Sequence, residues 1–181
     1  MKVDIYSIDG PLLISPKVFE DERGHFFESF SKTLFQHHGI NSEFVQDNQS
    51  LSQKGTLRGL HFQAPPYDQG KLVRVSRGRV LDIIVDIRKS SPTYGQSIAV
   101  ELSDKNYLQL WVPPGFAHGF SVLEDNTIFQ YKCTQFYNKS SEGGIIYNDE
   151  TLNIDWKVSH PIVSEKDLLL PSFKNFNSPF T

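Results

Sequence analysis

The sequence predicts a mainly all-β protein with antiparallel strands and a few short helices at the periphery. Short apolar and aromatic runs recur along the chain, and Gly, Pro, Asn and Asp separate them at short intervals. Helical periodicity is rare by comparison. Many short strands with few helices are typical of an antiparallel sandwich or barrel. We find no linker, repeat or low-complexity segment, so residues 1–181 are expected to form a single domain.

The first half of the chain contains the clearest local signals. Residues 24–30 (GHFFESF) have aromatic strand composition, and residues 31–40 (SKTLFQHHGI) form the best helix, with Ser31 as its N-cap and Gly39 as its stop. Residues 55–63 (GTLRGLHFQ) read as a buried strand. Residues 71–88 read as two strands folded at Gly78, and the second strand alternates strictly. One face carries Val80, Asp82, Ile84, Asp86 and Arg88, and the other carries Leu81, Ile83, Val85 and Ile87.

The second half continues with short strands. They are expected at residues 96–102, 107–113, 119–123 and 127–137. Residues 164–173 (SEKDLLLPSF) offer one helical turn that Ser164 could cap. The last segment, residues 171–181, matches no pattern, and it is expected either to pack on a partner subunit or to fray.

Composition and motifs exclude several classes of function. The net charge of −3 argues against a polyanion binder, so no nucleic acid partner is expected. The single Cys133 excludes an intramolecular disulfide and a cysteine-based zinc cluster. Neither a secretory signal nor a membrane-length apolar run is present, which predicts a soluble cytoplasmic protein. Gly-rich nucleotide-binding motifs are absent, so no bound NAD or ATP is expected.

Arg58 and His61 are unusual residues for the buried strand at 55–63. A buried guanidinium is rare unless it is paired, and a histidine among apolar neighbours needs a hydrogen-bond partner. A regular strand would place these two residues on opposite faces, because they are three positions apart. Gly59 lies between them, and a bulge or bend there would bring both side chains to one side.

Residues 113–118 (PPGFAH) have the spacing P-x-G-x-x-H, which resembles the second signature of the cupins, small jelly-roll barrels. Most cupins bind a metal with an H-x-H pair and a glutamate from an earlier strand. In this chain the earlier strand offers only His61, followed by Phe62 and Gln63. Because a stable metal site usually needs three or four ligands, we expect a metal-free barrel.

Several segments occur together in one order: residues 19–28 (FEDERGHFFE), 46–50 (QDNQS), 55–63, 71–75 (KLVRV), 85–95 (VDIRKSSPTYG), 111–120 (WVPPGFAHGF) and 164–167 (SEKD). This set resembles the dTDP-4-dehydrorhamnose 3,5-epimerases, cupin-fold enzymes of dTDP-L-rhamnose biosynthesis. The resemblance implies a jelly-roll barrel and a metal- and NAD-independent isomerase without cofactors. It also implies the substrate dTDP-4-keto-6-deoxyglucose, whose C3 and C5 protons are acidic because they lie α to the C4 ketone.

The resemblance assigns catalytic roles to four residues. His61 is the base and Tyr131 the proton donor, while Asp167 orients the histidine and Lys71 stabilises the enolate oxygen. Three of them have a structural alternative when taken alone. Asp167 could cap the turn after Ser164, Lys71 could protect a strand edge, and Tyr131 could be a core aromatic residue.

The resemblance also implies a set of substrate-binding residues. Arg58 holds the diphosphate or the sugar near it, His118 lies beside the sugar, and Tyr137 stacks on the thymine ring. The other matching positions are Gln46, Asn48, Glu142, Lys166, Arg23 and Glu28. Of these, Arg23 and Glu28 reach the nucleotide from the neighbouring subunit of a homodimer. Outside this framework they would be a solvated surface pair.

Three other functions remain as alternatives at this point. A single-carbon dTDP-deoxysugar epimerase would share the same base and donor. A non-catalytic sugar-nucleotide-binding cupin would be expected to lose one of them. A metal-dependent cupin oxygenase or isomerase is disfavoured by the missing H-x-H pair.

Overall fold

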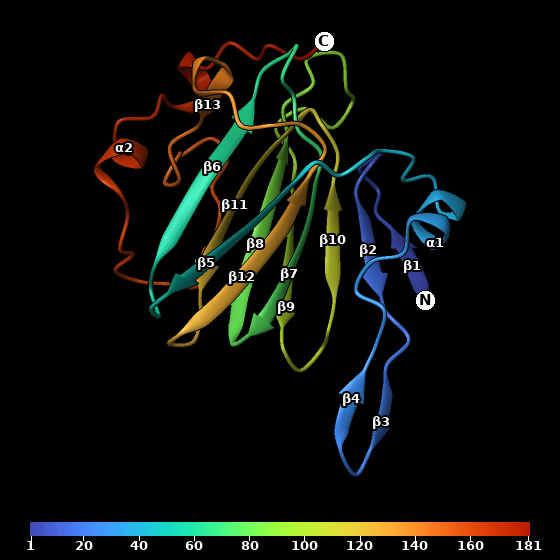
Figure 1. Ribbon diagram of the computed structural model, residues 1–181. Helices are drawn as coiled ribbons and strands as arrows, with labels where there is room; N and C mark the ends of the chain where they lie inside the picture. The colour runs from blue at the N-terminus through green and yellow to red at the C-terminus, as the bar shows by residue number, and fades with distance from the viewer.

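Two antiparallel sheets face each other in the computed structural model, which describes residues 1–181 (Figure 1). The six-stranded sheet has the order β1 (Lys2–Ile5), β2 (Leu12–Ser15), β10 (Gln109–Val112), β7 (Lys71–Arg77), β12 (Thr127–Cys133), β5 (Gln46–Ser52). The five-stranded sheet has the order β13 (Glu142–Gly144), β6 (Leu57–Gln63), β11 (Phe116–Val122), β8 (Arg79–Asp86), β9 (Ser97–Ser103). The predicted mainly β architecture with few short helices is confirmed.

The chain passes from one sheet to the other at the predicted turn at Gly78. β7 pairs with β10 and β12, whereas β8 pairs with β11 and β9. Gly78 has a φ of +80°, and a Cβ atom there would lie 2.3 Å from Thr127 Oγ1. Glycine is therefore the residue that lets the chain turn sharply against β12.

The alternation predicted for residues 80–88 is also confirmed, and both faces of β8 are buried. Val80 and Ile84 belong to the core cluster between the two sheets. Ile83 and Val85 point to the other side, into a second cluster formed with the C-terminal part of the chain. This arrangement explains why β8 is apolar on both faces apart from its two aspartates.

The C-terminal segment packs on its own domain, which corrects the expectation for residues 171–181. The Phe176 and Phe180 rings lie edge-on to Phe62 of β6, at centroid distances of 5.5 and 6.0 Å. Ser178 is buried and donates a hydrogen bond to the Ile87 carbonyl. The aromatic residues of this segment therefore cover the outer side of the five-stranded sheet of their own chain.

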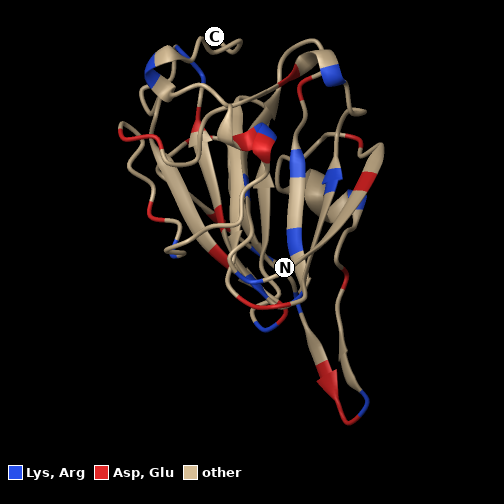
Figure 2. Ribbon diagram, turned by 90° about the vertical axis from the view of Figure 1, so that its left-hand side faces the viewer, with Lys and Arg blue, Asp and Glu red and all other residues tan.

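The remaining elements are peripheral. α1 (Lys32–His37) begins after Ser31 and ends before Gly39, whose φ is +86°, as predicted. The strand expected at residues 24–30 is shorter, because β4 (Gly24–Phe26) pairs only with β3 (Phe19–Asp21). These two strands form a hairpin that projects from the body, with charged residues near its tip (Figures 1 and 2). The short helices η1 (Lys139–Ser141), α2 (Glu165–Leu168) and η2 (Phe173–Asn175) complete the fold. No helix is both long and apolar enough to span a membrane.

Candidate active site

Two adjoining cavities of about 560 and 190 Å³ open between the sheets. They share Asn48, His61, Lys71 and Tyr131, so they form one continuous site. All residues that the sequence analysis singled out as catalytic or substrate-binding line one or both cavities, except Arg23 and Glu28. The larger cavity also contains Arg58, His118, Lys166 and Asp167, and the smaller one contains Gln46, Tyr137 and Glu142.

A bulge in β6 brings Arg58 and His61 into the same cavity. The pairing of β6 with β11 shifts register between His118 and Phe120, and Gly59 has a φ of +127°. A Cβ atom on Gly59 would lie 2.5 Å from the Gly119 Cα atom, so the two glycines make the close strand contact possible. The bend expected at Gly59 is therefore confirmed.

His61 and Asp167 form a close pair between β6 and α2. His61 Nε2 lies 2.8 Å from Asp167 Oδ1, and the Gly59 N–H donates to Oδ2 at 3.3 Å. Burial opposes ionisation of Asp167, but the hydrogen bond and charge of His61 outweigh it and lower the pKa of the carboxyl group. Asp167 is therefore an acceptor, so Nε2 carries the proton and Nδ1 of His61 keeps a free lone pair.

The predicted cap of α2 coexists with this pair. The Ser164 hydroxyl accepts a hydrogen bond from the Asp167 N–H at 3.1 Å. The backbone of Asp167 thus belongs to the capped turn, while its side chain serves His61. Asp167 therefore takes part in the capped turn through its backbone N–H and contacts His61 through its carboxylate.

Lys71 and Tyr131 lie on the neighbouring strands β7 and β12 of the six-stranded sheet, where Lys71 is opposite Cys133 and Tyr131 is opposite Val73. Both line the site. Burial lowers the pKa of the Lys71 ammonium, although Cys133, Asp82 and Glu142 partly oppose this. The ammonium forms no ion pair within the chain, so it is available to an anionic ligand atom. Burial raises the pKa of the Tyr131 phenol, which keeps the hydroxyl protonated at neutral pH.

A hydrogen bond and an ion pair link three residues that line the site, Tyr137, Glu142 and Lys166. Glu142 accepts a hydrogen bond from the Tyr137 hydroxyl at 2.8 Å and pairs with Lys166 at 2.6 Å. Burial opposes the charge of Glu142, but these two partners lower the pKa of its carboxyl group. The Tyr137 ring stays 56% exposed, so its flat face is accessible for stacking.

Comparisons with known proteins identify the family of this chain. A family model described as dTDP-4-dehydrorhamnose 3,5-epimerase matches residues 6–175. A curated protein of that name from Shigella flexneri is 53% identical over 169 residues, which cover 93% of both chains. The chain belongs to the dTDP-4-dehydrorhamnose 3,5-epimerase family. It is therefore an isomerase with the cupin fold.

Solved structures place the chain more closely within this group of epimerases. The enzyme from Legionella pneumophila Philadelphia 1, in complex with dTDP-4-keto-L-rhamnose, is 46% identical, with a TM-score of 0.93 and coverage of 97% of this chain and 94% of that one. A 3'-monoepimerase from Streptomyces bikiniensis, in complex with dTDP-quinovose, is 29% identical, with a TM-score of 0.86 and coverage of 92% and 85%. The chain is thus more similar to the listed 3,5-epimerase than to this single-carbon enzyme.

Two residues of the site were missed by the sequence analysis of this epimerase. Asp82 is fully buried and lies 2.9 Å from His118 Nε2. A carboxylate within the apolar run of β8 signals a buried partner, but which partner depends on the pairing of β8 with β11. Ser50 lines the larger cavity, and its buried hydroxyl has no hydrogen-bond partner. No sequence pattern distinguishes it from other serines.

Arg23 and Glu28 lie outside this site in the epimerase. Arg23 is on the projecting hairpin and pairs with Asp21, not with Glu28 as a surface pair would require. No cluster of three or more His, Cys, Asp or Glu side chains has the arrangement of a metal site.

Proposed function

We propose that this chain converts dTDP-4-dehydro-6-deoxy-D-glucose to dTDP-4-dehydro-L-rhamnose by epimerisation at C3 and C5, in dTDP-L-rhamnose biosynthesis. The observation that carries the proposal is the His61–Asp167 pair, which leaves the Nδ1 lone pair of the imidazole free in a cavity shared with Lys71 and Tyr131. A histidine in this arrangement is a general base whose tautomer and orientation are fixed by the carboxylate behind it.

His61 begins each epimerisation by removing a proton. The C–H bond α to the C4 ketone breaks, the proton moves to Nδ1, and the bonding electrons form an enolate with its negative charge on the C4 oxygen. Asp167 stabilises the resulting imidazolium through its short hydrogen bond.

Lys71 stabilises the enolate oxygen in this scheme. An ammonium ion can donate hydrogen bonds and offset the developing negative charge, and the effect is largest where water is scarce. Burial lowers the pKa of Lys71 because it takes the ammonium ion out of water, and an anion beside the ammonium ion compensates for this loss.

Tyr131 completes the inversion from the opposite face. Its hydroxyl gives a proton to the enolate carbon, which reverses the configuration and regenerates the ketone. The resulting phenolate then regains a proton from solvent, and His61 loses its own. A phenol with a raised pKa holds its proton until a strongly basic carbon is present.

The nucleotide is bound by the other residues of the site. Arg58 and Lys166 offer positive charge to the diphosphate, and Tyr137 offers its exposed ring to thymine. His118 lies beside the sugar. The amides of Gln46 and Asn48 and the carboxylate of Glu142 complete the set.

We further propose that the chain acts as a homodimer in the cytoplasm, with one domain spanning residues 1–181. Arg23 and Glu28 would then reach the nucleotide in the neighbouring subunit. This is supported by the exposure of both residues, by their absence from the lining of the site in their own chain, and by the projecting hairpin, whose turn carries Arg23.

The experiment that tests the reaction is mass spectrometry of dTDP-4-keto-6-deoxyglucose incubated with the protein in D₂O. The product is reduced rapidly with borohydride so that its stereochemistry is preserved for sugar analysis. We expect two enzyme-dependent deuterium atoms, and rhamnose or its C4 epimer after reduction. One deuterium with a singly inverted sugar would instead identify a single-carbon epimerase. No exchange above background, from protein that still binds dTDP, would identify a non-catalytic binding protein.

A further inference from the structure

The loop that carries Tyr137 is held by side chains and not by its own backbone. It joins β12, which ends at Cys133, to η1, and residues 135–137 take part in no backbone–backbone hydrogen bond. Tyr137 itself is 56% exposed, so packing of its ring contributes little to holding it. A loop with so few bonds of its own depends on neighbouring side chains for a fixed conformation.

Gln63, at the end of β6, binds this loop on both sides of Tyr137. Its side-chain nitrogen donates to the Phe136 carbonyl at 3.2 Å, and its oxygen accepts from the Asn138 N–H at 2.7 Å. The same nitrogen donates to the Tyr67 carbonyl at 2.6 Å. Gln63 is only 5% exposed, so one buried amide satisfies three backbone groups, two of which flank Tyr137.

Two other glutamines bind the same loop. Gln69 donates to the Gln135 carbonyl at 2.7 Å, and Gln46 accepts from the Tyr137 N–H at 3.1 Å. Both line the smaller cavity together with Gln63. The loop is therefore attached at residues 135, 136, 137 and 138 through amide side chains that come from outside it.

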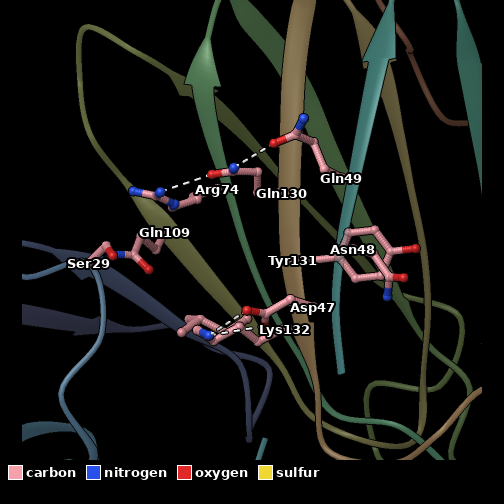
Figure 3. A pocket seen from close by; sticks show the side chains of 10 residues that line it. Ser29, Asp47, Asn48, Gln49, Arg74, Gln109, Gln130, Tyr131 and Lys132 are labelled. Atoms are coloured by element: carbon pink, nitrogen blue, oxygen red, sulfur yellow. Dashed lines mark hydrogen bonds and ion pairs between the residues drawn. The ribbon is translucent and has the colours of Figure 1, made fainter. Parts of the chain in front are cut away.

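Gln63 differs from Gln46 in the partners of its side chain. Gln46 is an expected substrate-binding residue and donates to Asn48, which lies beside Tyr131 on the neighbouring strand β12 (Figure 3). The Gln63 side chain bonds only to backbone groups of two loops. A substitution of Gln63 therefore changes the support of Tyr137 and leaves the hydrogen bonds of the proposed base and proton donor in place.

The hydroxyl end of Tyr137 is held from the same region. It donates to Glu142 at 2.8 Å, and Glu142 lies opposite Gln63 in the pairing of β13 with β6. The backbone and the tip of Tyr137 are thus both attached to neighbouring positions of one sheet. A side chain that is already ordered loses less conformational entropy when a ligand binds to it.

We propose that Gln63 is a positioning residue for nucleotide recognition, which acts through the backbone on both sides of Tyr137 and holds the ring where thymine stacks on it. The inference rests on the nucleotide binding of the proposed function and adds a residue that acts through another one.

The test is a double-mutant cycle on the purified full chain, in which calorimetry measures the dissociation constant for dTDP. We expect Tyr137→Ala to raise this constant about 5- to 150-fold, the range for the loss of one base–aromatic stack. Gln63→Met should raise it about fivefold, a cost within the range for ordering one side chain on binding. In the Tyr137→Ala background the same substitution should change it less than about twofold, because no ring remains to be positioned.

A merely structural role of Gln63 predicts a different result. The lost hydrogen bonds would then lower the affinity for dTDP by the same factor with tyrosine or alanine at position 137. Inorganic pyrophosphate is a probe without a base, and we expect Gln63→Met to change its dissociation constant less than about twofold. Gln53→Met is the control, because Gln53 is exposed and donates only to Asn126, at 3.4 Å.

The possible outcomes separate this inference from the proposed reaction. If Gln63→Met binds dTDP like the wild type, or loses the same factor in both backgrounds, the inference is wrong and the reaction stands. If Gln63→Met does not fold, Gln69→Met decides in its place, since it removes only the bond to Gln135 and should raise the dissociation constant about threefold with Tyr137 present but not with alanine. A wild-type chain that does not bind dTDP would overturn both proposals. A chain that shows the expected coupling but no exchange in D₂O would overturn the reaction alone.

Discussion

Asp167→Asn is the substitution that most directly tests the arrangement of the base. The carboxylate of Asp167 accepts from two donors, His61 Nε2 at 2.8 Å and the Gly59 N–H at 3.3 Å. An asparagine has one acceptor oxygen for these two donors. If the oxygen remains on Gly59, the amide N–H₂ group faces His61 Nε2 and is compatible only with the tautomer that is protonated at Nδ1. The base then has no lone pair toward the substrate.

The expected loss of turnover is about 10³- to 10⁴-fold at neutral pH, which is the size of effect that the same acid-to-amide change has in a Ser–His–Asp triad. The fold is expected to survive, because the Ser164 cap binds the backbone N–H of residue 167 and does not need the carboxylate. The cost in free energy of unfolding is expected to be about 1 kcal/mol, the value of one hydrogen bond. Binding of dTDP should change little, since the nucleotide contacts lie elsewhere in the site.

The assay is the initial rate of deuterium incorporation from D₂O, with dTDP affinity measured in parallel. Asp155→Asn serves as the control, because Asp155 pairs only with Lys157 on the surface. If folded Asp167→Asn incorporates deuterium within tenfold of the wild-type rate, Asp167 does not set the tautomer of His61 and the reasoning is refuted.

Three other substitutions test separate parts of the account. Burial lowers the pKa of Lys71, so we expect the activity of the wild-type chain to fall with rising pH already below pH 10.5. Lys71→Gln should remove this fall. If the activity of the variant still falls at the same pH, the assignment of the fall to Lys71 is wrong. Tyr131→Phe should keep exchange of the proton on the His61 face and lose net inversion, so loss of both from a folded variant would argue against the proposed division of roles. Asp86→Asn should lower the free energy of unfolding by about 2 kcal/mol at pH 7. Burial raises the pKa of the Asp86 carboxyl group, but the hydrogen bonds from Arg88, Ser91 and Thr93 outweigh burial and hold this pKa at about 2 instead of 3.8. That stabilisation is present above pH 3.8 and is lost as the pH falls through about 2. Urea unfolding should therefore show that the difference in unfolding free energy between the wild type and Asp86→Asn shrinks over this range. A constant difference would exclude the carboxylate charge as its origin.

Much of the fold and of the site was predictable from the sequence because the relevant signals are local. The alternation in β8 reports two buried faces, and Ser31 and Gly39 mark the limits of α1. Arg58, Gly59 and His61 within one apolar run suggested a bend at Gly59, because a bend there could bring the two polar side chains to one side of the strand. The resemblance of whole motifs supplied the substrate, which no periodicity could supply.

Other features depended on pairings that no local pattern contains. Asp82 contacts His118 only because β8 and β11 are neighbours in the five-stranded sheet. The tail at 171–181 has three phenylalanines, but no pattern in it predicts that Phe176 and Phe180 pack on Phe62.

The sequence by itself determined the strands, their inward residues and the chemical groups available for proton transfer. The tertiary structure decided which groups meet. His61 and Asp167 are 106 residues apart, and their contact depends on the bulge in β6 and on the placement of α2. Side-chain type and spacing can be read from residues that are neighbours in the sequence. The tautomer and basicity of an imidazole depend instead on the charged groups that the fold places within hydrogen-bond distance of it.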